Sequence, residues 1–374
     1  MPKPILRIGL LLLLIAGPAV ALEKPPRIAA QAWALVDATS GAVLAEHGAR
    51  RRLPPASLTK LMTAYLVFER LRAGSLTLEE RVRVSPEAAR TRGSRVPLRA
   101  GDEVTVEALI KSMLLRSANN ATVALAEHIA GSEARFVDAM NARARAWGLV
   151  ETHFVNSTGL DRPGHLSSAR DLTRIALALI RDFPDYYGWF SLREFDFNDH
   201  IVRNSNPLLY ADAADGIKTG YTRNAGWCLI ASAERAPMRL IATVLGAPGR
   251  RARVNASRAL LDYGFRNFET QLVYRAHAPA AEARVWLGEA VTVPLGVAQD
   301  LYVTLPRGRH ASLEKLVAVA DAPYAPVHLG QPLGSLRLAL DGEVYGEYPL
   351  VALKDVAVGG AVQQAIDNWR LLMQ

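Results

Sequence analysis

Three short polar motifs stand in a fixed order along this chain of 374 residues: Ser57-Leu58-Thr59-Lys60, Ser117-Ala118-Asn119 and Lys218-Thr219-Gly220. Each motif alone is weak evidence. Together they offer a serine hydroxyl beside an amine, a polar relay, and a cation that can hold a carboxylate. Because the motifs lie 60 and 101 residues apart, a fold that uses them must bring distant segments together. The combination predicts a serine acyl-transfer enzyme.

Lysine usage supports a chemical role for the motif lysines. The chain has 7 Lys and 37 Arg, so arginine supplies nearly all of its positive charge. Lys60 and Lys218 are two of the few lysines, and both lie inside motifs. Arginine would solvate a surface equally well, but it cannot release its proton near neutral pH. A lysine that is buried or lies beside a second cation can become a base.

Residues 1–21 have the pattern of an export signal. Lys3 and Arg7 give a positive start, residues 8–16 are almost wholly apolar, and residues 19–21 (Ala-Val-Ala) fit the small-x-small rule for cleavage. We expect cleavage after this tripeptide. An uncleaved membrane anchor is the less favoured alternative, because the apolar run is short of the ~20 residues that span a bilayer.

Composition indicates a folded protein that is soluble or peripheral once exported. Hydrophobic residues are 50% and charged residues 21%, which suits one large domain or two ordinary ones and argues against general disorder. Without the signal, the formal charge falls from +8 to +6. A solvated basic surface, an anionic wall polymer or anionic lipid would suit this charge, whereas nucleic acid is a disfavoured partner for an exported protein.

The single cysteine, Cys228, excludes an internal disulfide. It lies in an apolar run, which indicates a core residue more than a reactive thiol. The sequence shows no metal-ligand cluster and no phosphate-binding loop, so we expect no metal and no cofactor. It does not fix an oligomeric state.

Residues 22–268 are expected to form one mixed domain. A turn at residues 37–41 predicts a hairpin within residues 32–44. Apolar residues at helical spacing predict helices, and two apolar runs after Gly220 predict adjacent strands. The expected helices cover residues 58–71, 105–115, 120–130, 132–147, 168–181 and 253–263, the last ending at Gly264, and the expected strands cover residues 226–233 and 239–245.

The sequence after residue 268 changes in character. In residues 269–355, short apolar runs are broken by Gly, Pro and Asp, which predicts a small all-β domain. Residues 356–374 are expected to form an amphipathic helix. Either a membrane-surface helix or a helix docked on its own domain fits this pattern. Its apolar face comprises Val358, Val362, Ala365, Ile366, Trp369, Leu372 and Met373, and its polar face comprises Gln363, Gln364, Asp367, Asn368 and Arg370.

Ser57 and Lys60 stand three residues apart at a predicted helix N-terminus, so their side chains share a face. The first-turn N–H groups and the helix dipole favour negative charge near Ser57. Serine needs an adjacent base, and Lys60 is the candidate within one turn. Its pKa would have to fall well below ~10.4; burial and a nearby Lys218 would both lower it. An N-cap serine beside a solvated lysine is the ordinary alternative for such a motif taken alone.

The other two motifs also have structural and chemical interpretations. Ser117 and Asn119 lie between two apolar helices, where such residues commonly cap helix ends. In an acyl-transfer site, Ser117 would relay a proton to the leaving amine and Asn119 would hold a substrate amide. At the start of a predicted strand, Lys218 and Thr219 can bind a carboxylate, and Gly220 lets a peptide backbone approach closely.

In this order and spacing, the motifs resemble those of the penicillin-recognising serine enzymes. Flanking sequences are similar to the low-molecular-mass penicillin-binding proteins that act as serine-type D-alanyl-D-alanine carboxypeptidases. The similar segments are residues 55–63, 156–160, 167–172, 215–222 and 301–308. The resemblance covers nearly the whole mature chain. It implies an α+β, β-lactamase-like domain with an antiparallel sheet, flanking helices and a helical subdomain, followed by an all-β domain and an amphipathic helix.

The resemblance also implies chemical roles. Ser57 would attack the carbonyl between two D-alanines of a peptidoglycan stem peptide, Lys60 would take its proton, and Ser117 would pass a proton to the departing D-alanine. The backbone N–H groups of Ser57 and Tyr221 would form the oxyanion hole. Tyr221 stands where some relatives have His, so only its backbone role is implied. Substrate contacts are implied for Asn119, Lys218, Thr219, Gly220, Tyr221 and Arg253.

The same resemblance implies covalent inhibition by β-lactams and attachment of the C-terminal helix to the periplasmic face of the inner membrane. Other functions share parts of the pattern. A β-lactamase is disfavoured because Glu151 and Asn156 are five residues apart, whereas the lactamase pattern places them four apart. An endopeptidase that cuts cross-links is poorly separated from a carboxypeptidase. A silent scaffold is disfavoured because every motif position is intact, and the role of Arg203 stays open.

Overall fold

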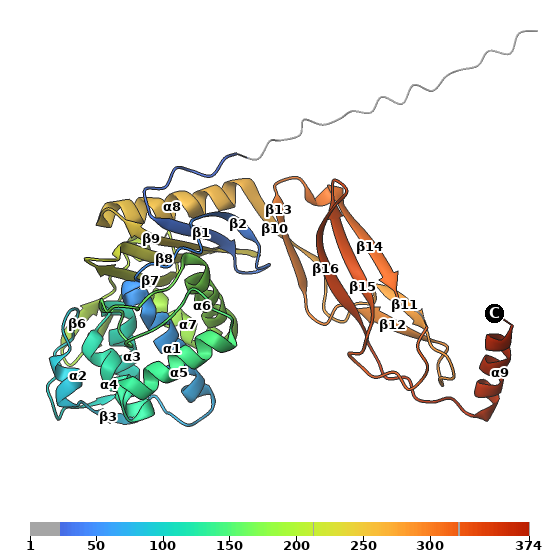
Figure 1. The fold of residues 1–374 in the computed structure, drawn as a ribbon, viewed down its shortest axis with the longest axis horizontal. Helices are drawn as coiled ribbons and strands as arrows, with labels where there is room; N and C mark the ends of the chain where they lie inside the picture. Colours follow the sequence, from blue (N-terminus) through green and yellow to red (C-terminus); the bar gives the residue numbers. More distant parts are fainter. Residues whose placement is uncertain (1–22, 212, 321, 374) are drawn as a thin grey trace, which may run out of the picture.

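A computed structural model of the chain describes residues 23–211, 213–320 and 322–373. The expected signal peptide, residues 1–21, lies outside the described residues. The chain forms a larger domain of helices and sheet, an elongated β domain and a terminal helix (Figure 1). The expected α+β class with a following all-β domain is therefore confirmed.

A five-stranded antiparallel sheet of order β2-β1-β9-β8-β7 lies at the centre of the larger domain. The expected hairpin is β1 (Ala32–Asp37) with β2 (Val43–His47), and β1 pairs on its other side with β9 (Met238–Ala247). The strand β8 (Gly226–Arg235) joins β9 to β7 (Gly216–Thr222). The third motif therefore lies on an edge strand, and among the residues that the structure describes no strand pairs with the other side of β7.

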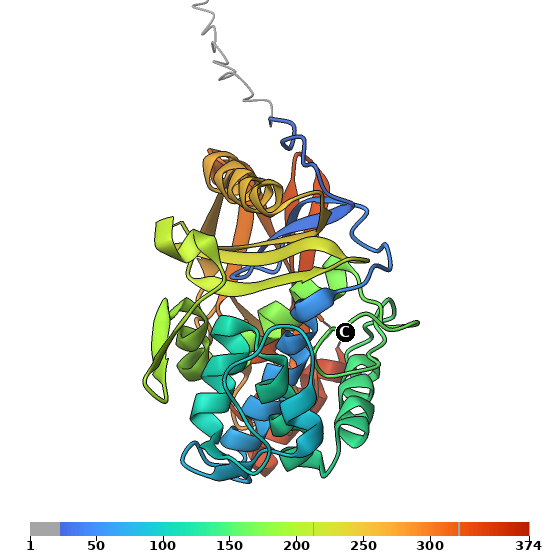
Figure 2. The ribbon, with the colours of Figure 1, turned by 90° about the vertical axis from the view of Figure 1, so that its left-hand side faces the viewer.

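Helices pack on both faces of this sheet, which Figure 2 shows in side view. The helix α8 (Arg250–Asn267) covers one face, and α6 (Ala169–Asp182) covers the other with α1 (Lys60–Arg72) packed beside it. Helix α8 is longer than expected and continues past Gly264. A Cβ at Gly264 would lie 2.5 Å from a methyl carbon of Leu240. This glycine therefore permits close packing on the sheet and does not end the helix.

A helical subdomain completes the larger domain. At its centre is α4 (Asn119–Ala130), which contacts α3 (Val106–Lys111) and α5 (Glu133–Ala146). The expected helix over residues 105–115 ends early as a regular α-helix, because residues 112–116 continue as a π-helical turn. The remaining elements are α2 (Pro86–Arg90), α7 (Pro184–Tyr187), and the strand pairs β3 (Arg81–Arg83) with β4 (Glu103–Thr105) and β5 (Glu194–Phe197) with β6 (His200–Arg203).

The all-β domain begins with a strand that the sequence pattern did not reveal, β10 (Phe268–Tyr274), paired with β13 (Leu301–Pro306). A five-stranded antiparallel sheet of order β11-β12-β16-β15-β14 follows. Its strands are β11 (Ala281–Arg284), β12 (Thr292–Gly296), β14 (Leu313–Val319), β15 (Pro332–Leu340) and β16 (Glu343–Ala352). Leucine and valine side chains from these strands form a separate hydrophobic core.

Asp37, at the end of β1, connects the two domains. Its carboxylate accepts hydrogen bonds from the hydroxyls of Thr270 and Thr304, on β10 and β13. It also accepts the backbone N–H of Thr39 at 2.8 Å. The side chain is fully buried, so these donors replace water as its partners.

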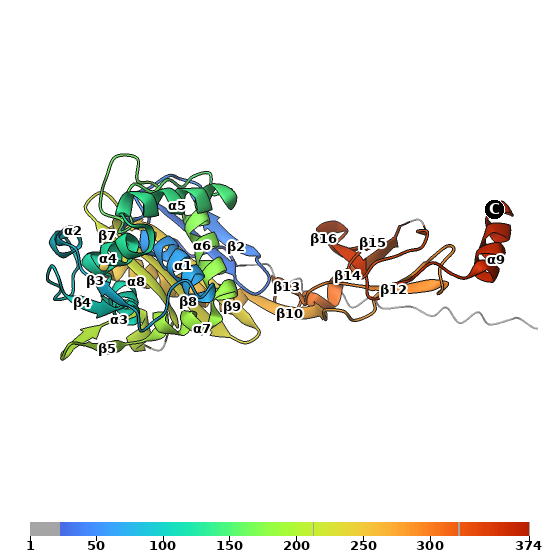
Figure 3. The ribbon, with the colours of Figure 1, turned by 90° about the horizontal axis from the view of Figure 1, so that it is seen from below.

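The terminal helix α9 (Ala361–Leu372) lies at the end of the β domain, away from the larger domain (Figure 3). It docks through its polar face. Asp367 is fully buried and accepts the backbone N–H of Leu287 at 2.9 Å. Its apolar face points outward, with Val362, Trp369 and Leu372 exposed by 77%, 64% and 85%. Within the described ranges, no helix has the length and hydropathy needed to cross a membrane.

Candidate active site

Ser57 lies in a short 3-10 helix, η1 (Ala56–Thr59), that leads directly into α1. The edge strand β7 passes close to it. A Cβ at Gly220 would lie 3.2 Å from the backbone nitrogen of Ser57 and 3.2 Å from the Cβ of Ala56. The first and third motifs therefore meet, although Lys218 stands 161 positions after Ser57 in the sequence. The close approach that Gly220 permits is to the protein's own η1 segment.

Lys60 is fully buried and joins the first motif to the second. Its Nζ donates to Asn119 Oδ1 at 2.7 Å and to the Thr158 carbonyl at 2.6 Å, and lies 3.2 Å from Ser57 Oγ. The two shorter contacts are to oxygens that can only accept a hydrogen bond. A neutral amine has two N–H donors for these oxygens and one lone pair for the Ser57 hydroxyl. The contacts therefore fit Lys60 as the base for Ser57.

Burial lowers the pKa of Lys60 well below its usual value, and the nearby Lys218 lowers that pKa further. The charge of Glu133 opposes this shift. Both motif lysines are buried, whereas the other lysines of the described chain are partly or fully exposed. The sequence-based expectation that these two lysines serve chemistry thus gains support from their environment.

Lys218 lies on β7 and is almost fully buried. Its Nζ donates to the carbonyl of the adjacent Thr219 at 3.3 Å. Burial, aided by the charge of Arg253, lowers the pKa of Lys218 to about 7. An incoming carboxylate would favour its charged form. Lys218 can therefore act as an anchor whose charge is strengthened when an anionic substrate binds.

Asn119 begins α4 and is fixed in one orientation. Its Nδ2 donates to the Arg92 carbonyl at 2.7 Å, which turns its Oδ1 toward Lys60. The backbone N–H of Asn119 donates to the Ser94 carbonyl at 2.7 Å. A Cβ at Gly93 would lie 2.6 Å from Asn119 Nδ2. The side chain of Asn119 therefore orients Lys60, and the contact with a substrate amide that the sequence indicated stays a prediction.

Ser117 follows the π-helical turn and has a left-handed backbone conformation, with φ +62°. This conformation is uncommon for a residue other than glycine, asparagine or aspartate. Its Oγ is buried and has no hydrogen-bond partner in the part of the chain that the structure describes. Buried hydroxyls are normally satisfied. The unsatisfied hydroxyl is available to a ligand, as a proton relay requires.

Thr219 and Arg253 contact groups along β7. The Oγ1 of Thr219 lies 3.1 Å from Ser205 Oγ, and Ser205 donates to the Leu115 carbonyl at 2.9 Å. Arg253 is buried and donates to the Gly220 and Cys228 carbonyls at 2.9 and 3.1 Å. The guanidinium therefore holds β7 against β8 and places positive charge behind Lys218.

Tyr221 differs from its neighbours on β7 because its side chain is 52% exposed. Its ring contacts the ring of Trp227, with centroids 4.3 Å apart. The guanidinium of Arg253 lies 4.9 Å from the centroid of Trp227. These ring contacts hold the aromatic side chain of Tyr221 beside Trp227, and its backbone lies on the edge strand.

Sequence reasoning did not assign a role to the loop that supplies the Thr158 carbonyl. Asn156 Oδ1 accepts backbone N–H groups of Thr158 and Gly159 at 3.1 and 2.7 Å. Glu133 Oε1 accepts the N–H and hydroxyl of Ser157 at 2.9 and 2.6 Å. These contacts shape the loop around Lys60. The segment Asn156-Ser157-Thr158-Gly159 was part of the family resemblance, and this was the only signal for it in the sequence.

Other candidate residues lie outside this cluster. Arg203 forms a surface ion pair with Glu194, with Nε 3.4 Å from Oε2. Glu151 lies 3.6 Å from Arg50 and is not among the charges that shift the pKa of Lys60. Cys228 is a buried core residue, as expected, and burial raises the pKa of its thiol to about 11. Among the described residues, no group of three His, Cys, Asp or Glu side chains could hold a metal.

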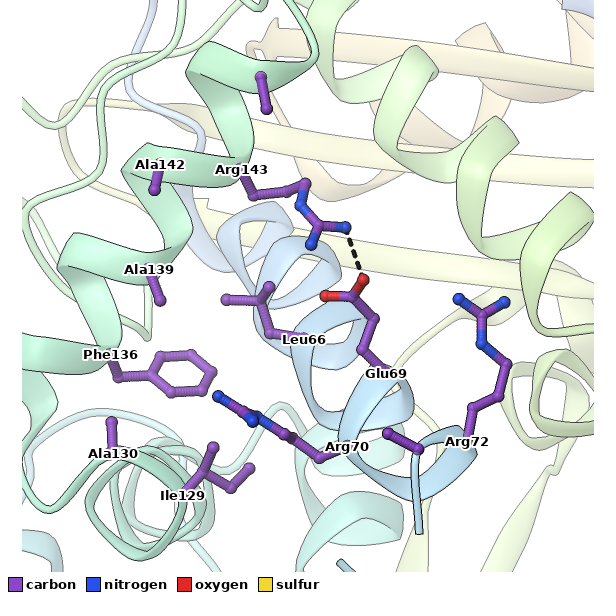
Figure 4. Close-up of a pocket in the computed structure, with 12 residues that line it drawn as sticks. Leu66, Glu69, Arg70, Arg72, Ile129, Ala130, Phe136, Ala139, Ala142 and Arg143 are labelled. Atoms are coloured by element: carbon purple, nitrogen blue, oxygen red, sulfur yellow. Dashed lines mark hydrogen bonds and ion pairs between the residues drawn. The ribbon is translucent and has the colours of Figure 1, made fainter. Parts of the chain in front are cut away.

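A groove of about 680 Å³ lies elsewhere, between α1, α4 and α5. Figure 4 shows Arg143 reaching toward Glu69 across it, at 2.7 Å between Nη1 and Oε1. The groove is lined near its floor by Leu66 and Phe136. None of the motif residues lines it, so it is separate from the cluster around Ser57.

Comparison with known proteins identifies the family of this chain. Residues 19–249 match the family model described as D-alanyl-D-alanine carboxypeptidase, and residues 268–358 match the model for the penicillin-binding protein 5 C-terminal domain. The chain is 40% identical to the D-alanyl-D-alanine carboxypeptidase DacC of Escherichia coli (strain K12) over 361 residues, which cover 93% of this chain and 90% of that protein.

Two further relatives bear on the fold and activity. A D-alanyl-D-alanine endopeptidase of Pseudomonas aeruginosa is 30% identical over 332 residues, which cover 84% of this chain and 97% of that protein. The crystal structure of penicillin binding protein 5 from Haemophilus influenzae matches with a TM-score of 0.85 and 38% identity, over 90% of this chain and 99% of that chain. This chain therefore belongs to the family of serine-type D-alanyl-D-alanine carboxypeptidases and has the penicillin-binding fold with its C-terminal β domain.

Proposed function

We propose that this chain removes the terminal D-alanine from peptidoglycan stem pentapeptides through an acyl-enzyme on Ser57. The observation that carries the proposal is the environment of Lys60: a buried amine, 3.2 Å from Ser57 Oγ, with two carbonyl oxygens as its other partners. This arrangement provides the base that a serine nucleophile needs.

Acylation begins when the neutral Lys60 amine takes the proton of the Ser57 hydroxyl. Ser57 Oγ then bonds to the carbonyl carbon of the penultimate D-alanine, and an electron pair of the C=O bond moves to its oxygen. The backbone N–H groups of Ser57 and Tyr221 stabilise this oxyanion, a contribution typically worth ~2.7–4 kcal/mol per donor. The C–N bond breaks as the leaving nitrogen gains a proton, which Ser117 passes on from Lys60.

In deacylation, Lys60 again acts as the base and Ser57 becomes the leaving group. A water molecule gives a proton to Lys60, and the water oxygen attacks the ester carbon of the acyl-enzyme. The Ser57–carbonyl bond then breaks, and Ser57 Oγ recovers a proton. The products are free D-alanine from the first step and the shortened peptide from the second.

Within the described ranges, the edge of β7 away from β8 pairs with no strand, and this edge would provide a place for the substrate backbone. An extended peptide can add to such an edge through main-chain hydrogen bonds. Lys218 and Thr219 would bind the terminal carboxylate, and Asn119 would hold a substrate amide. Arg253 adds charge from behind the strand. A β-lactam would occupy the same place in this chain, and a penicillin-binding protein D2 of Listeria monocytogenes was solved in an ampicillin-bound form.

The substrate assignment can be tested with two defined peptides. Mature protein is incubated with a stem pentapeptide that ends in D-Ala-D-Ala and with a matched cross-linked dimer. We expect release of D-alanine from the pentapeptide and no cleavage of the dimer, with the Ser57→Ala variant as the inactive control. Faster cleavage of the dimer would instead assign an endopeptidase. Equal release by the Ser57→Ala variant would remove Ser57 as the nucleophile.

We also propose that residues 1–21 direct export and that α9 holds the mature protein at the periplasmic face of the inner membrane. The apolar face of α9 is exposed while its polar face docks on the β domain through Asp367. A helix that packed on its own domain for stability would bury its apolar face. Arg370 is the only basic residue of α9, so apolar burial would supply most of its affinity for lipid.

Deleting residues 358–374 is expected to abolish sedimentation with phospholipid vesicles and to leave D-alanine release within about twofold, because the helix is remote from Ser57. The matched pair Trp369→Ser and Asn368→Ser separates the two faces: the first should weaken sedimentation and the second should not. Vesicle binding that persists after the deletion would assign the membrane contact to another surface. Because few cations are involved, binding should change little between low and physiological salt.

A further inference from the structure

The backbone N–H of Ser57 belongs to the peptide unit that it shares with Ala56. A peptide bond is planar, so fixing the direction of its carbonyl also fixes the direction of its N–H. Ala56 has φ +48°, a left-handed conformation that an alanine rarely adopts. Tertiary contacts must therefore hold this peptide, and the contacts to the Ala56 carbonyl decide where the Ser57 N–H points.

Thr59 contacts that carbonyl from within η1. Its Oγ1 donates to the Ala56 carbonyl oxygen at 2.8 Å. The same Oγ1 lies 2.8 Å from Nε2 of His165, a residue 106 positions away in the sequence. Both side chains are buried. A hydroxyl has one proton, so when Thr59 donates to Ala56 it must accept from His165.

The hydrogen bond to the other ring nitrogen, Nδ1, sets the tautomer of His165. The backbone N–H of Val155 donates to His165 Nδ1 at 2.9 Å. Since Nδ1 accepts, the neutral ring carries its proton on Nε2 and donates it to Thr59. The hydrogen bonds therefore run in one direction, from Val155 through His165 and Thr59 to the Ala56 carbonyl.

The charge state of His165 agrees with this direction. Burial, together with the charges of His153 and Lys60 and against that of Asp161, lowers the pKa of His165 to about 4. The imidazole is therefore neutral at neutral pH and can accept at Nδ1 while it donates at Nε2. A cationic ring would have to donate at both nitrogens and would lose the hydrogen bond from Val155.

We propose that Thr59 and His165 are positioning residues that aim the Ser57 N–H at the oxyanion by holding the Ala56 carbonyl. Each donor in the chain also polarises the next group, and the last bond draws electron density toward the Ala56 oxygen, which makes the Ser57 N–H a stronger donor. The proposal rests on the proposed function, because this N–H is an oxyanion donor only if Ser57 is the nucleophile.

The test compares Thr59→Val, which removes the hydroxyl at nearly constant shape, with Thr59→Ser, which keeps it. Acylation by a fluorescent penicillin is followed by rapid mixing over a range of concentrations. An oxyanion contact acts in the transition state, so the acylation rate constant at saturation should fall while the apparent affinity stays within about twofold. We expect about a tenfold fall for Thr59→Val, less than the ~10²–10³ of a lost donor, and recovery to within about threefold for Thr59→Ser.

Thr173→Val is the matched control for a buried threonine. Thr173 also donates to a backbone carbonyl, that of Ala169 at 2.7 Å, and also contacts a second side chain, Thr243 at 2.7 Å. It lies on α6, outside the site. Thr173→Val should lower the melting temperature about as much as Thr59→Val but leave the acylation rate constant unchanged. Equal slowing by both variants, or a wild-type rate for Thr59→Val, would overturn the proposal.

A second pair of variants, at His165, tests the proposal even if Thr59→Val does not fold. His165→Gln retains an N–H donor for Thr59, whereas His165→Leu removes it. The glutamine variant should acylate several-fold faster than the leucine variant, and equal rates would refute the role of His165. Failure of the proposed function would look different: wild-type protein would then form no penicillin adduct, or Ser57→Ala would still form one.

Discussion

Replacing Lys60 by arginine is expected to slow acylation by a fluorescent penicillin about 10²- to 10⁴-fold, the range typical of a lost general base. Arginine stays positively charged near neutral pH, so it cannot accept the proton of Ser57 as the neutral amine of Lys60 would. The N–H donors of the guanidinium also need hydrogen-bond acceptors in a buried site that fits a single amine. In that site, Asn119 Oδ1 and the Thr158 carbonyl lie 2.7 and 2.6 Å from Nζ. Rapid-mixing measurement of the acylation rate constant checks this result.

Lys111→Arg is the matched control, because Lys111 is an outer lysine that pairs with Glu107 at 2.6 Å. It should acylate at the wild-type rate. A Lys60→Arg variant that acylates within a few-fold of wild type would show that Lys60 acts through its charge and not as a base. Retention of a cooperative thermal transition by Lys60→Arg establishes that a slow rate reflects chemistry and not unfolding.

The base assignment also fixes the sign of the pH dependence of kcat/KM, which reports the free enzyme. Activity should rise with pH as Lys60 loses its proton, since only the neutral amine accepts one. It should fall at higher pH as Lys218 loses the charge that binds the carboxylate, and the pKa of Lys218 is about 7. Because Lys60 and Lys218 interact, the apparent pKa values of the rising and falling parts of the pH profile describe the pair and not either residue alone. A rate that keeps rising well above pH 8 would contradict the role of Lys218.

The residues that gather around Ser57 could be singled out in the sequence because they lie in short motifs. Ser57 and Lys60 are one helical turn apart, so their contact follows from local geometry. The meeting of these residues with Asn119 and Lys218 required the family resemblance, since spacing alone does not show which distant segments touch. The scarcity of lysine beside 37 arginines indicated a chemical role for the two lysines, and burial was expected as a cause of a lowered pKa of Lys60, but the Thr158 carbonyl was not expected as a partner.

The features that the sequence did not reveal depend on the backbone or on contacts between distant segments. Every residue type has a backbone carbonyl, so residue type does not single out the carbonyl of Thr158. The contact of His165 with Thr59 joins residues that are 106 positions apart in the sequence. Gly264 was expected to end α8, because glycine commonly follows a helix. Tertiary packing against Leu240 decided its role instead. The helical spacing of apolar residues predicted where the helices lie, whereas tertiary contacts determine where they end.

Gly159 provides the second prediction with a large expected effect. It has φ +86°, and a Cβ there would lie 1.8 Å from the Ala56 carbonyl oxygen and 2.9 Å from the Ser57 nitrogen. No side chain fits at such distances, so Gly159→Ala must displace either the loop that bears Thr158 or the η1 segment that bears Ser57. Either shift separates the groups that now lie 2.6–3.2 Å from Lys60 Nζ. We expect acylation to slow by more than about 10²-fold, since small misplacements cost this much.

Gly101→Ala separates this collision from backbone strain. Gly101 has φ +90° but no atom within 4 Å of an added Cβ, so both variants bear the strain of a left-handed alanine, roughly 1–2 kcal/mol. Gly101→Ala should therefore lower the free energy of unfolding by about that amount and leave acylation within twofold. The additional loss of acylation rate in Gly159→Ala, compared with Gly101→Ala, measures the effect of the collision with Ala56. Equal rates for the two variants would mean that the loop can move without disturbing Ser57, and that Lys60 tolerates the loss of its Thr158 partner.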